Sequence, residues 1–153
     1  MKGRTTLKEA LEKLQKFCAS RERCHQEVRN KLLSLKVYGD DLEEIISQLV
    51  TNGFLNEERF ARSYARGKFR MSKWGRTKII YGLKGKHVAD YCIEKGLEEI
   101  DEEEYLALID ELLEKQLKGD YSFDTKRKVV ASLQRKGFET PLILERMAEI
   151  NEN

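Results

Sequence analysis

The chain is poor in the residues that interrupt helices. Its 153 residues include a single proline, Pro141, and ten glycines that never cluster. Charged residues make up 37% of the chain and hydrophobic residues 40%, which is typical of a helix-rich protein with a well-solvated exterior. A chain of this length buries roughly 70% of the surface that it exposes when unfolded. The composition therefore predicts an all-α fold with a hydrophobic core.

Long apolar runs are also absent. The opening stretch, MKGRTTLKEALEKL, has no uninterrupted apolar segment of the kind that a signal peptide requires. No later segment approaches the length of a membrane-spanning helix. We therefore expect a cytoplasmic protein that makes no contact with a membrane.

Cysteine and histidine are too few to indicate a disulfide framework or a metal centre. Cys18, Cys24 and Cys92 are odd in number and form no CxxC pair. Cys24 precedes His25, but neighbours on a helix point about 100° apart and no second pair completes a tetrahedral site. His87 has no nucleophile or orienting carboxylate beside it in the sequence. The sequence thus predicts packed, reduced thiols, no metal, no cofactor and no enzymatic activity.

Helix signals follow one another along the chain. Asp40 and Glu43 have the spacing of a capping box, in which the first side chain caps the opening turn and the second reaches back. Asn52 and Gly53 predict the end of that helix, because both residues tolerate the left-handed conformation at a helical C-terminus. Asn56 is the expected N-cap of the next helix.

An internal repeat of about fifty residues is the most informative feature of the architecture. The segments EVRNKLLSLKV, KIIYGLKGKHV and KVVASLQRKGF align, and each is flanked by predicted helices. Each segment places a leucine (Leu32, Leu83, Leu133) five residues before an apolar residue (Val37, Val88, Phe138). We predict three tandem three-helix repeats: residues 1–54, a basic repeat at 55–100, and 101–153 with an acidic first helix.

Charge is distributed unevenly over these repeats. Residues 59–86 contain ten lysines or arginines and no acidic residue, whereas residues 98–114 contain nine acidic residues and no basic one. On one helix, Arg59, Arg62, Arg66, Arg70 and Lys73 would share a face, with Phe60, Tyr64 and Met71 packed about a third of a turn away. Gly67 is a candidate interruption of that helix.

A charged face is most often only a solvated surface. A solubilising face, however, usually mixes both signs, because like charges at i, i+4 cost a few tenths of a kcal/mol. An unpaired basic face is favourable where it meets a polyanion or an acidic protein surface. We therefore predict a face that binds a partner or DNA, with Arg62, Arg66, Arg70 and Lys73 exposed. Its candidate residues are Arg62, Arg66, Lys68, Arg70, Lys73, Arg76, Lys78 and Lys84.

Four segments in order resemble the signatures of the RecX family of recombination regulators: RERCHQEVRNKL, GFLNEERFARSYARGK, GRTKIIYGLKGKHV and RKVVASLQRKGF. The similarity covers nearly the whole chain, and residues 53–64 are its most specific part. The resemblance implies an all-helical, elongated and curved array of three three-helix repeats that binds the RecA recombinase filament on DNA. It further implies that binding damps the ATPase, strand-exchange and coprotease activities of the filament. We expect such a protein to act as a monomer.

The sequence departs from the family pattern at a few helix ends. Cys24 stands where a serine or threonine is usual, which removes an N-cap worth about 1 kcal/mol unless another group replaces it. Gly82 replaces a usual glutamate, which makes the basic segment more cationic. His87 replaces the glycine that ends the same helix, and Gly85 is the expected substitute for that stop.

Two other classes of protein are weighed against this interpretation. An autonomous nucleic-acid-binding protein with recognition-helix modules would present base-reading side chains, yet residues 59–86 contain no Asn or Gln. An enzyme would need a convergent nucleophile, base or metal set, which the sequence does not indicate. We therefore favour a regulatory protein that acts by binding.

Overall fold

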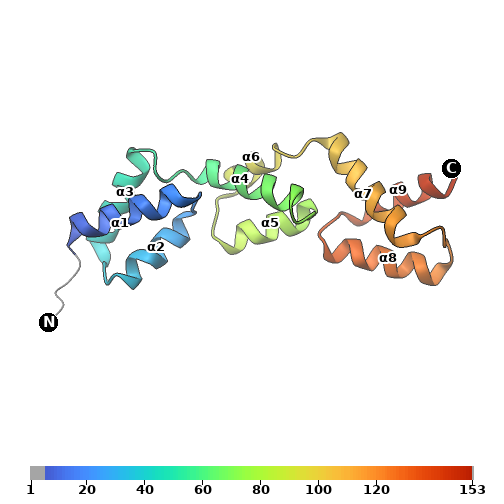
Figure 1. The fold of residues 1–153 in the computed structure, drawn as a ribbon, viewed down its shortest axis with the longest axis horizontal. Helices are drawn as coiled ribbons and strands as arrows, with labels where there is room; N and C mark the ends of the chain where they lie inside the picture. The colour runs from blue at the N-terminus through green and yellow to red at the C-terminus, as the bar shows by residue number, and fades with distance from the viewer. Residues whose placement is uncertain (1–5, 153) are drawn as a thin grey trace.

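The structure, a computed structural model, describes residues 6–152. Over that range the chain forms nine α-helices and no strand, arranged as an elongated array with α1 and α9 at opposite ends (Figure 1). The prediction of an elongated all-α protein is confirmed. The helices are α1 (Leu7–Ser20), α2 (His25–Ser34), α3 (Gly39–Thr51), α4 (Glu57–Arg70), α5 (Arg76–Gly85), α6 (Asp90–Leu97), α7 (Glu102–Leu117), α8 (Phe123–Arg135) and α9 (Thr140–Glu152).

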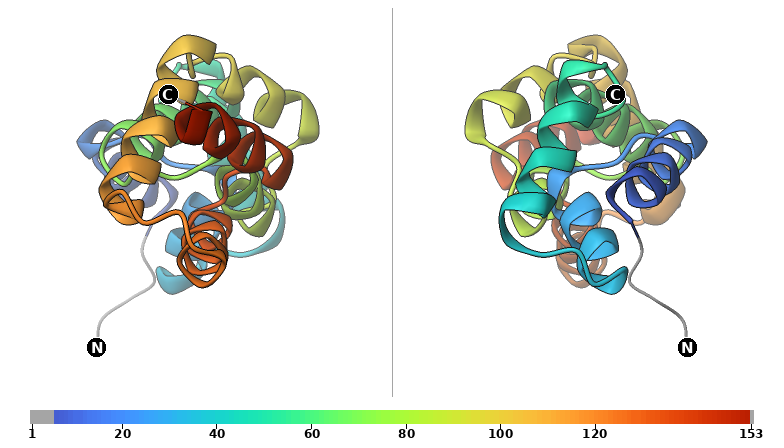
Figure 2. Two further views of the ribbon diagram at one scale, coloured as in Figure 1. Left: turned by 90° about the vertical axis from the view of Figure 1, so that its right-hand side faces the viewer. Right: turned by 90° about the vertical axis from the view of Figure 1, so that its left-hand side faces the viewer.

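The helices pack in three consecutive triplets. Each helix has its main packing partners within its own triplet, which we call the first unit (α1–α3), the middle unit (α4–α6) and the third unit (α7–α9). Seen along the long axis, the units overlap one another, as expected of a stacked array (Figure 2). In the middle unit α4 and α6 cross closely, because a Cβ atom on Gly96 would lie 2.7 Å from the Ala61 carbonyl oxygen.

The repeat is visible in the backbone as one helix-ending motif used three times. The N–H groups of Val37, Val88 and Phe138 donate to the carbonyls of Leu32, Leu83 and Leu133 at 3.0, 3.1 and 3.1 Å. The residue before each donor is left-handed: Lys36 (φ 62°), His87 (φ 61°) and Gly137 (φ 96°). This is the Schellman geometry. The leucine-to-apolar spacing seen in the sequence therefore reflects the same helix-ending motif at the second helix of each unit.

Several helix-boundary predictions are confirmed and others are wrong. α3 ends before Asn52, with Gly53 left-handed at φ 78°, and Asn56 accepts a hydrogen bond from the Arg59 N–H at 2.9 Å. The capping box is wrong, because α3 begins at Gly39 and Glu43 pairs instead with Arg29 on α2.

The substitute stop proposed for α5 is also wrong. Gly85 is still helical, and His87 itself takes the left-handed conformation in spite of its side chain. Gly67 does not interrupt α4, which continues to Arg70. A single glycine inside a helix costs about 1 kcal/mol relative to alanine, which the packing of α4 offsets.

The middle and third units share one hydrophobic core and cap each other's helices. The first N–H groups of α5 are satisfied across the junction: Gly75 donates to the Lys136 carbonyl at 2.7 Å and Thr77 to the Gly137 carbonyl at 3.0 Å. The backbones touch, since a Cβ atom on Gly75 would lie 2.3 Å from the Gly137 carbonyl carbon. Tyr105 is completely buried there, between Phe69 and Phe138.

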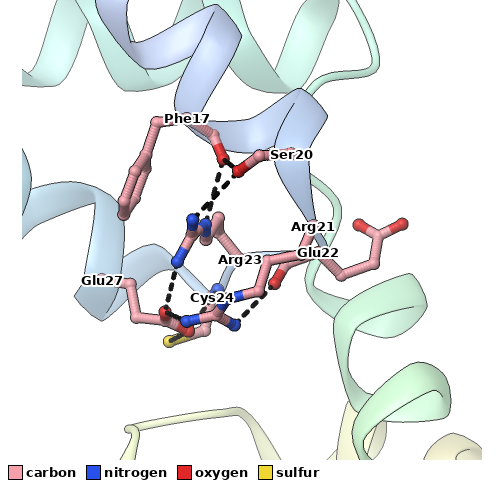
Figure 3. Close-up of polar contacts among 7 residues, drawn as sticks. All are labelled: Phe17, Ser20, Arg21, Glu22, Arg23, Cys24 and Glu27. Carbon is pink, nitrogen blue, oxygen red and sulfur yellow. Dashed lines mark hydrogen bonds and ion pairs between the residues drawn. The ribbon is translucent and has the colours of Figure 1, made fainter.

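The first unit has a separate core and caps its own helices. In the turn between α1 and α2, Arg23 donates to the Phe17 carbonyl at 3.0 Å and to the Ser20 hydroxyl at 3.0 Å (Figure 3). Glu27 accepts from the Cys24 N–H at 3.3 Å, which is the contact that the third residue of a helix makes in a capping box. Burial alone would raise the pKa of Glu27, but hydrogen bonds from Cys24 and the charge of Arg21 lower it.

Few contacts hold the first unit to the middle one. Arg59 at the start of α4 pairs with Glu22 at 2.6 Å and donates to the carbonyls of Gly53 and Phe54. Cys24 is the first-unit residue whose side chain joins the core of the other two units. The array is therefore a two-unit block carrying a more loosely attached first unit.

Candidate functional site

The candidate basic residues begin on α4, whose buried face holds Phe60, Ala61, Ala65 and Phe69. The arginines lie on its remaining faces. The face predicted from the sequence is interrupted, because α4 ends at Arg70 and the next candidate falls in the loop to α5. That residue, Lys73, has a left-handed backbone with φ 57°.

Two of the predicted properties of this face are wrong. Met71 was expected to pack, but 87% of it is exposed because it lies beyond the last turn of α4. Arg62 was expected to be exposed, but only 30% of its side chain is accessible. Helical periodicity places residues on a face and says nothing of the segments that later cover that face.

Arg62 and Arg66 are both held by one carboxylate. Glu99, in the turn after α6, accepts from Arg62 at 2.9 Å and from Arg66 at 2.5 Å. The hydrogen bond from Arg62, and next that from Arg66, hold the pKa of Glu99 below its ordinary value. Arg62 also approaches Glu58 one turn earlier, at 3.5 Å. These two arginines therefore brace α4 against the end of α6.

Arg76 belongs to the junction between units. Its guanidinium pairs with Glu139 at 2.9 Å and with Glu102, and it lies over the Tyr105 ring at 3.9 Å from the ring centre. Its backbone N–H donates to the Tyr105 hydroxyl at 2.9 Å, and that hydroxyl donates to Glu139. We assign Arg76 a structural role at this junction.

Lys68 and Lys78 surround an aromatic side chain. Their ammonium groups lie 4.7 and 4.5 Å from the centre of the Trp74 ring. Trp74 in turn meets Tyr64 edge to face, at 6.4 Å between ring centres. Cation–π contacts of this kind contribute about 0.5–1 kcal/mol at exposed sites. Trp74 and Tyr64 are thus partly buried beneath lysines, whereas Tyr81 is 80% exposed.

Arg70, Lys73 and Lys84 complete the candidate set. Arg70 and Lys84 are exposed and form no ion pair with any carboxylate of residues 6–152. Lys73 approaches Glu111 on α7 at 3.6 Å. The structure therefore does not bring the eight candidates together on one continuous face.

The opposite charge blocks of the sequence partly neutralise each other in the fold. Arg62 and Arg66 meet Glu99, Arg76 meets Glu102, and Lys73 meets Glu111. All three carboxylates belong to the acidic block at 98–114. The expectation of a wholly uncompensated basic segment is wrong, because the two blocks are separated along the chain and adjacent in space.

A second concentration of positive charge was missed in the sequence. A groove of about 600 Å³ lies between α7 and α8 and reaches the loop after α4. Its floor contains Leu112 and Val129, both buried. Five lysines line it: Lys73, Lys115, Lys118, Lys128 and Lys136. No single run of basic residues signals this groove, since its lysines are spread over 64 positions of the chain.

The remaining chemistry of the described residues is sparse. Cys18 and Cys24 are buried free thiols, and burial raises the pKa of each. Burial also raises the pKa of Cys92, which is half-buried. Residues 6–152 contain no cluster of three or more His, Cys, Asp or Glu side chains arranged to hold a metal ion. None of the helices in this part of the chain is both long and apolar enough to span a bilayer.

The fold and the site together define an all-helical tandem-repeat protein with basic surfaces in its second and third units. The family described as "RecX, second three-helix domain" matches residues 56–97. The crystal structure of RecX from Lactobacillus salivarius superimposes with a TM-score of 0.87 at 25% identity, covering 96% of this chain and 97% of that one.

Two curated relatives carry the same name, "Regulatory protein RecX". The protein of Prosthecochloris aestuarii is 28% identical over 148 residues, covering 95% of this chain and 96% of its own length. That of Pelodictyon phaeoclathratiforme is 31% identical over 127 residues, covering 81% of this chain and 78% of its own. The chain belongs to the RecX family of regulatory proteins.

Proposed function

We propose that this protein binds RecA recombinase filaments on DNA and lowers their ATPase, strand-exchange and coprotease activities. The observation that carries the proposal is the similarity to RecX regulatory proteins along nearly the whole chain. The shape is suited to it, because stacked helical units offer an extended surface that can contact more than one protomer of a filament. The protein acts by binding and needs no chemistry of its own.

Cationic side chains of the middle unit are proposed to contact acidic filament surface or the DNA backbone. Of the eight candidates, Arg70 and Lys84 are the best suited, since both are exposed and neither has an ion-pair partner among residues 6–152. Arg62, Arg66 and Arg76 are less available, because carboxylates of the same molecule already hold them. Lys68 and Lys78 remain candidates, because neither has an ion-pair partner among residues 6–152.

The direct test is DNA-dependent ATP hydrolysis by the RecA of the same organism. We expect the purified protein to slow hydrolysis in a concentration-dependent way while hydrolysing no ATP itself. The double variant Arg70→Glu, Lys84→Glu should raise the half-inhibitory concentration at least about tenfold, because reversed charges weaken association with an acidic partner. Its melting temperature should match that of the unaltered protein, since both side chains are exposed.

A matched control changes the same charge elsewhere. Lys13 and Lys16 are exposed lysines of α1, and Lys13→Glu with Lys16→Glu produces the same change in net charge. Inhibition should be unaffected in this control. Equal loss in both double variants would remove the middle unit from the proposal, and an unaltered protein without effect on the recombinase would refute the function itself.

A further inference from the structure

The lysine groove of the third unit is built like an anion site. Four of its lysines, Lys115, Lys118, Lys128 and Lys136, form no ion pair with a carboxylate of residues 6–152. The fifth, Lys73, has Glu111 at 3.6 Å. No aspartate or glutamate is among the residues that line the groove.

This arrangement contrasts with two arginines at the same end of the array. Arg76 is paired with Glu102 and Glu139, and Arg146 is paired with Asp110 at 2.6 Å. Grouped like charges repel one another, and a groove concentrates their field and attracts anions. A bound polyanion would remove the repulsion that the fold leaves in place here.

The side-chain types are compatible with a phosphate backbone. Lysine ammonium groups act as point charges that bind phosphate oxygens without the planar, two-pronged geometry that an arginine guanidinium offers to carboxylates and phosphates alike. The lining offers no aromatic ring on which a base could stack, and its floor is aliphatic. Gln116 adds a polar group of the kind that contacts phosphate and sugar. The lining thus fits a strand's backbone better than its bases.

We propose that this groove binds the phosphodiester backbone of a single nucleic-acid strand without reading its sequence. It lies mainly in the third unit, and the loop after α4 of the middle unit contributes Lys73. The assignment rests on the proposed function only for the presence of DNA beside the bound filament. It makes Lys73 the one residue shared by the basic segment of the sequence and the groove.

The test measures binding of the isolated full chain to a labelled oligothymidylate of about 16 nucleotides, by fluorescence anisotropy across a salt series. For single strands, a plot of the logarithm of the binding constant against the logarithm of the salt concentration has a slope of about −0.7 per phosphate contact. The variant Lys118→Gln, Lys128→Gln should therefore reduce the slope by about 1.4 and weaken binding about tenfold at low salt.

The control neutralises two charges on the other side of the same helix. Lys126 and Arg127 of α8 line a separate groove against α9, and Lys126→Gln with Arg127→Gln should leave affinity and slope unchanged. Equal losses of affinity in both double variants would contradict the proposed role of the groove. An unaltered protein that binds no oligonucleotide would contradict it too. If polyglutamate displaced the oligonucleotide as effectively as inorganic polyphosphate of equal charge, the groove would be a site for an acidic protein. The proposal would then be wrong.

The outcome is separable from that of the proposed function. If the protein inhibits the recombinase but binds no strand, the proposal for the groove is wrong and the proposed function stands. If the protein binds the strand through Lys118 and Lys128 but leaves ATP hydrolysis unchanged, the proposal for the groove stands and the proposed function is wrong.

Discussion

Glu99 shows how one side chain organises the basic segment. Its carboxylate accepts hydrogen bonds from Arg62 and Arg66 of α4, which precede it in the chain by 37 and 33 residues. Because these hydrogen bonds favour the ionised form, the pKa of Glu99 lies below the ordinary value of 4.5. A lowered pKa in the folded state stabilises the fold above the unfolded pKa, and this contribution disappears as the pH falls through the folded pKa.

We therefore predict an acid-dependent effect of Glu99→Gln. The variant should unfold at lower urea concentration than the unaltered protein above about pH 5, and the difference should shrink to nothing as the pH falls well below the carboxyl pKa. Urea titrations at a series of pH values measure it. Glu94→Gln on the exposed side of α6 is the control, and a difference for Glu99→Gln that persisted unchanged at low pH would contradict the assignment.

At the scale of the elements, glycines decide how closely the units approach. Gly75 and Gly137 face each other across the junction, where a Cβ atom on Gly75 would meet backbone atoms at 2.3–2.4 Å. Gly67 in α4 has nothing within 4 Å of its own Cβ position. The two sites therefore predict opposite effects of the same substitution.

Gly75→Ala should destabilise the protein by more than about 2 kcal/mol, because a rigid backbone cannot yield without opening the junction. Gly67→Ala should stabilise it by about 0.5–1 kcal/mol, because alanine loses less conformational entropy in a helix. Chemical denaturation of both variants checks the prediction. A Gly75→Ala protein as stable as the unaltered one would show that the close junction does not exist in solution.

The helices and their repeat could be predicted from the sequence more fully than the contacts between helices. The three-unit repeat could be predicted because Leu32, Leu83 and Leu133 recur at a spacing that local hydrogen bonds impose. The pairing of Arg62 with Glu99 could not, since it depends on how α6 ends beside α4. Four groove lysines were missed for the same reason: Lys118 and Lys128 become neighbours only after α7 and α8 pack together.

At the scale of the whole molecule, stability is divided between two cores. One joins residues of the middle and third units, and the other lies within the first unit. The repeat limits at residues 54 and 100 remain a prediction, and the two cores specify how to test them. Separate cores open separately, and native-state hydrogen exchange detects such partial opening.

Leu14→Ala, at a fully buried position of α1, should destabilise its unit by about 2–5 kcal/mol. Amide exchange should then accelerate in α1–α3 while α7–α9 keep their protection. Leu113→Ala, equally buried in α7, should accelerate exchange in both α4–α6 and α7–α9. If Leu14→Ala accelerated exchange equally in all nine helices, the division into two cores would be wrong.

The capping of α5 by the carbonyls of Lys136 and Gly137 fixes an order of events during synthesis. The first unit contains its whole core by Leu55, so it can fold as soon as it leaves the ribosome. α5 must wait for its cap, which follows Gly75 by about 60 residues, or about 3–12 s of translation at 5–20 residues per second. During that interval the nascent chain carries a finished first unit and a middle unit whose second helix still has an open end.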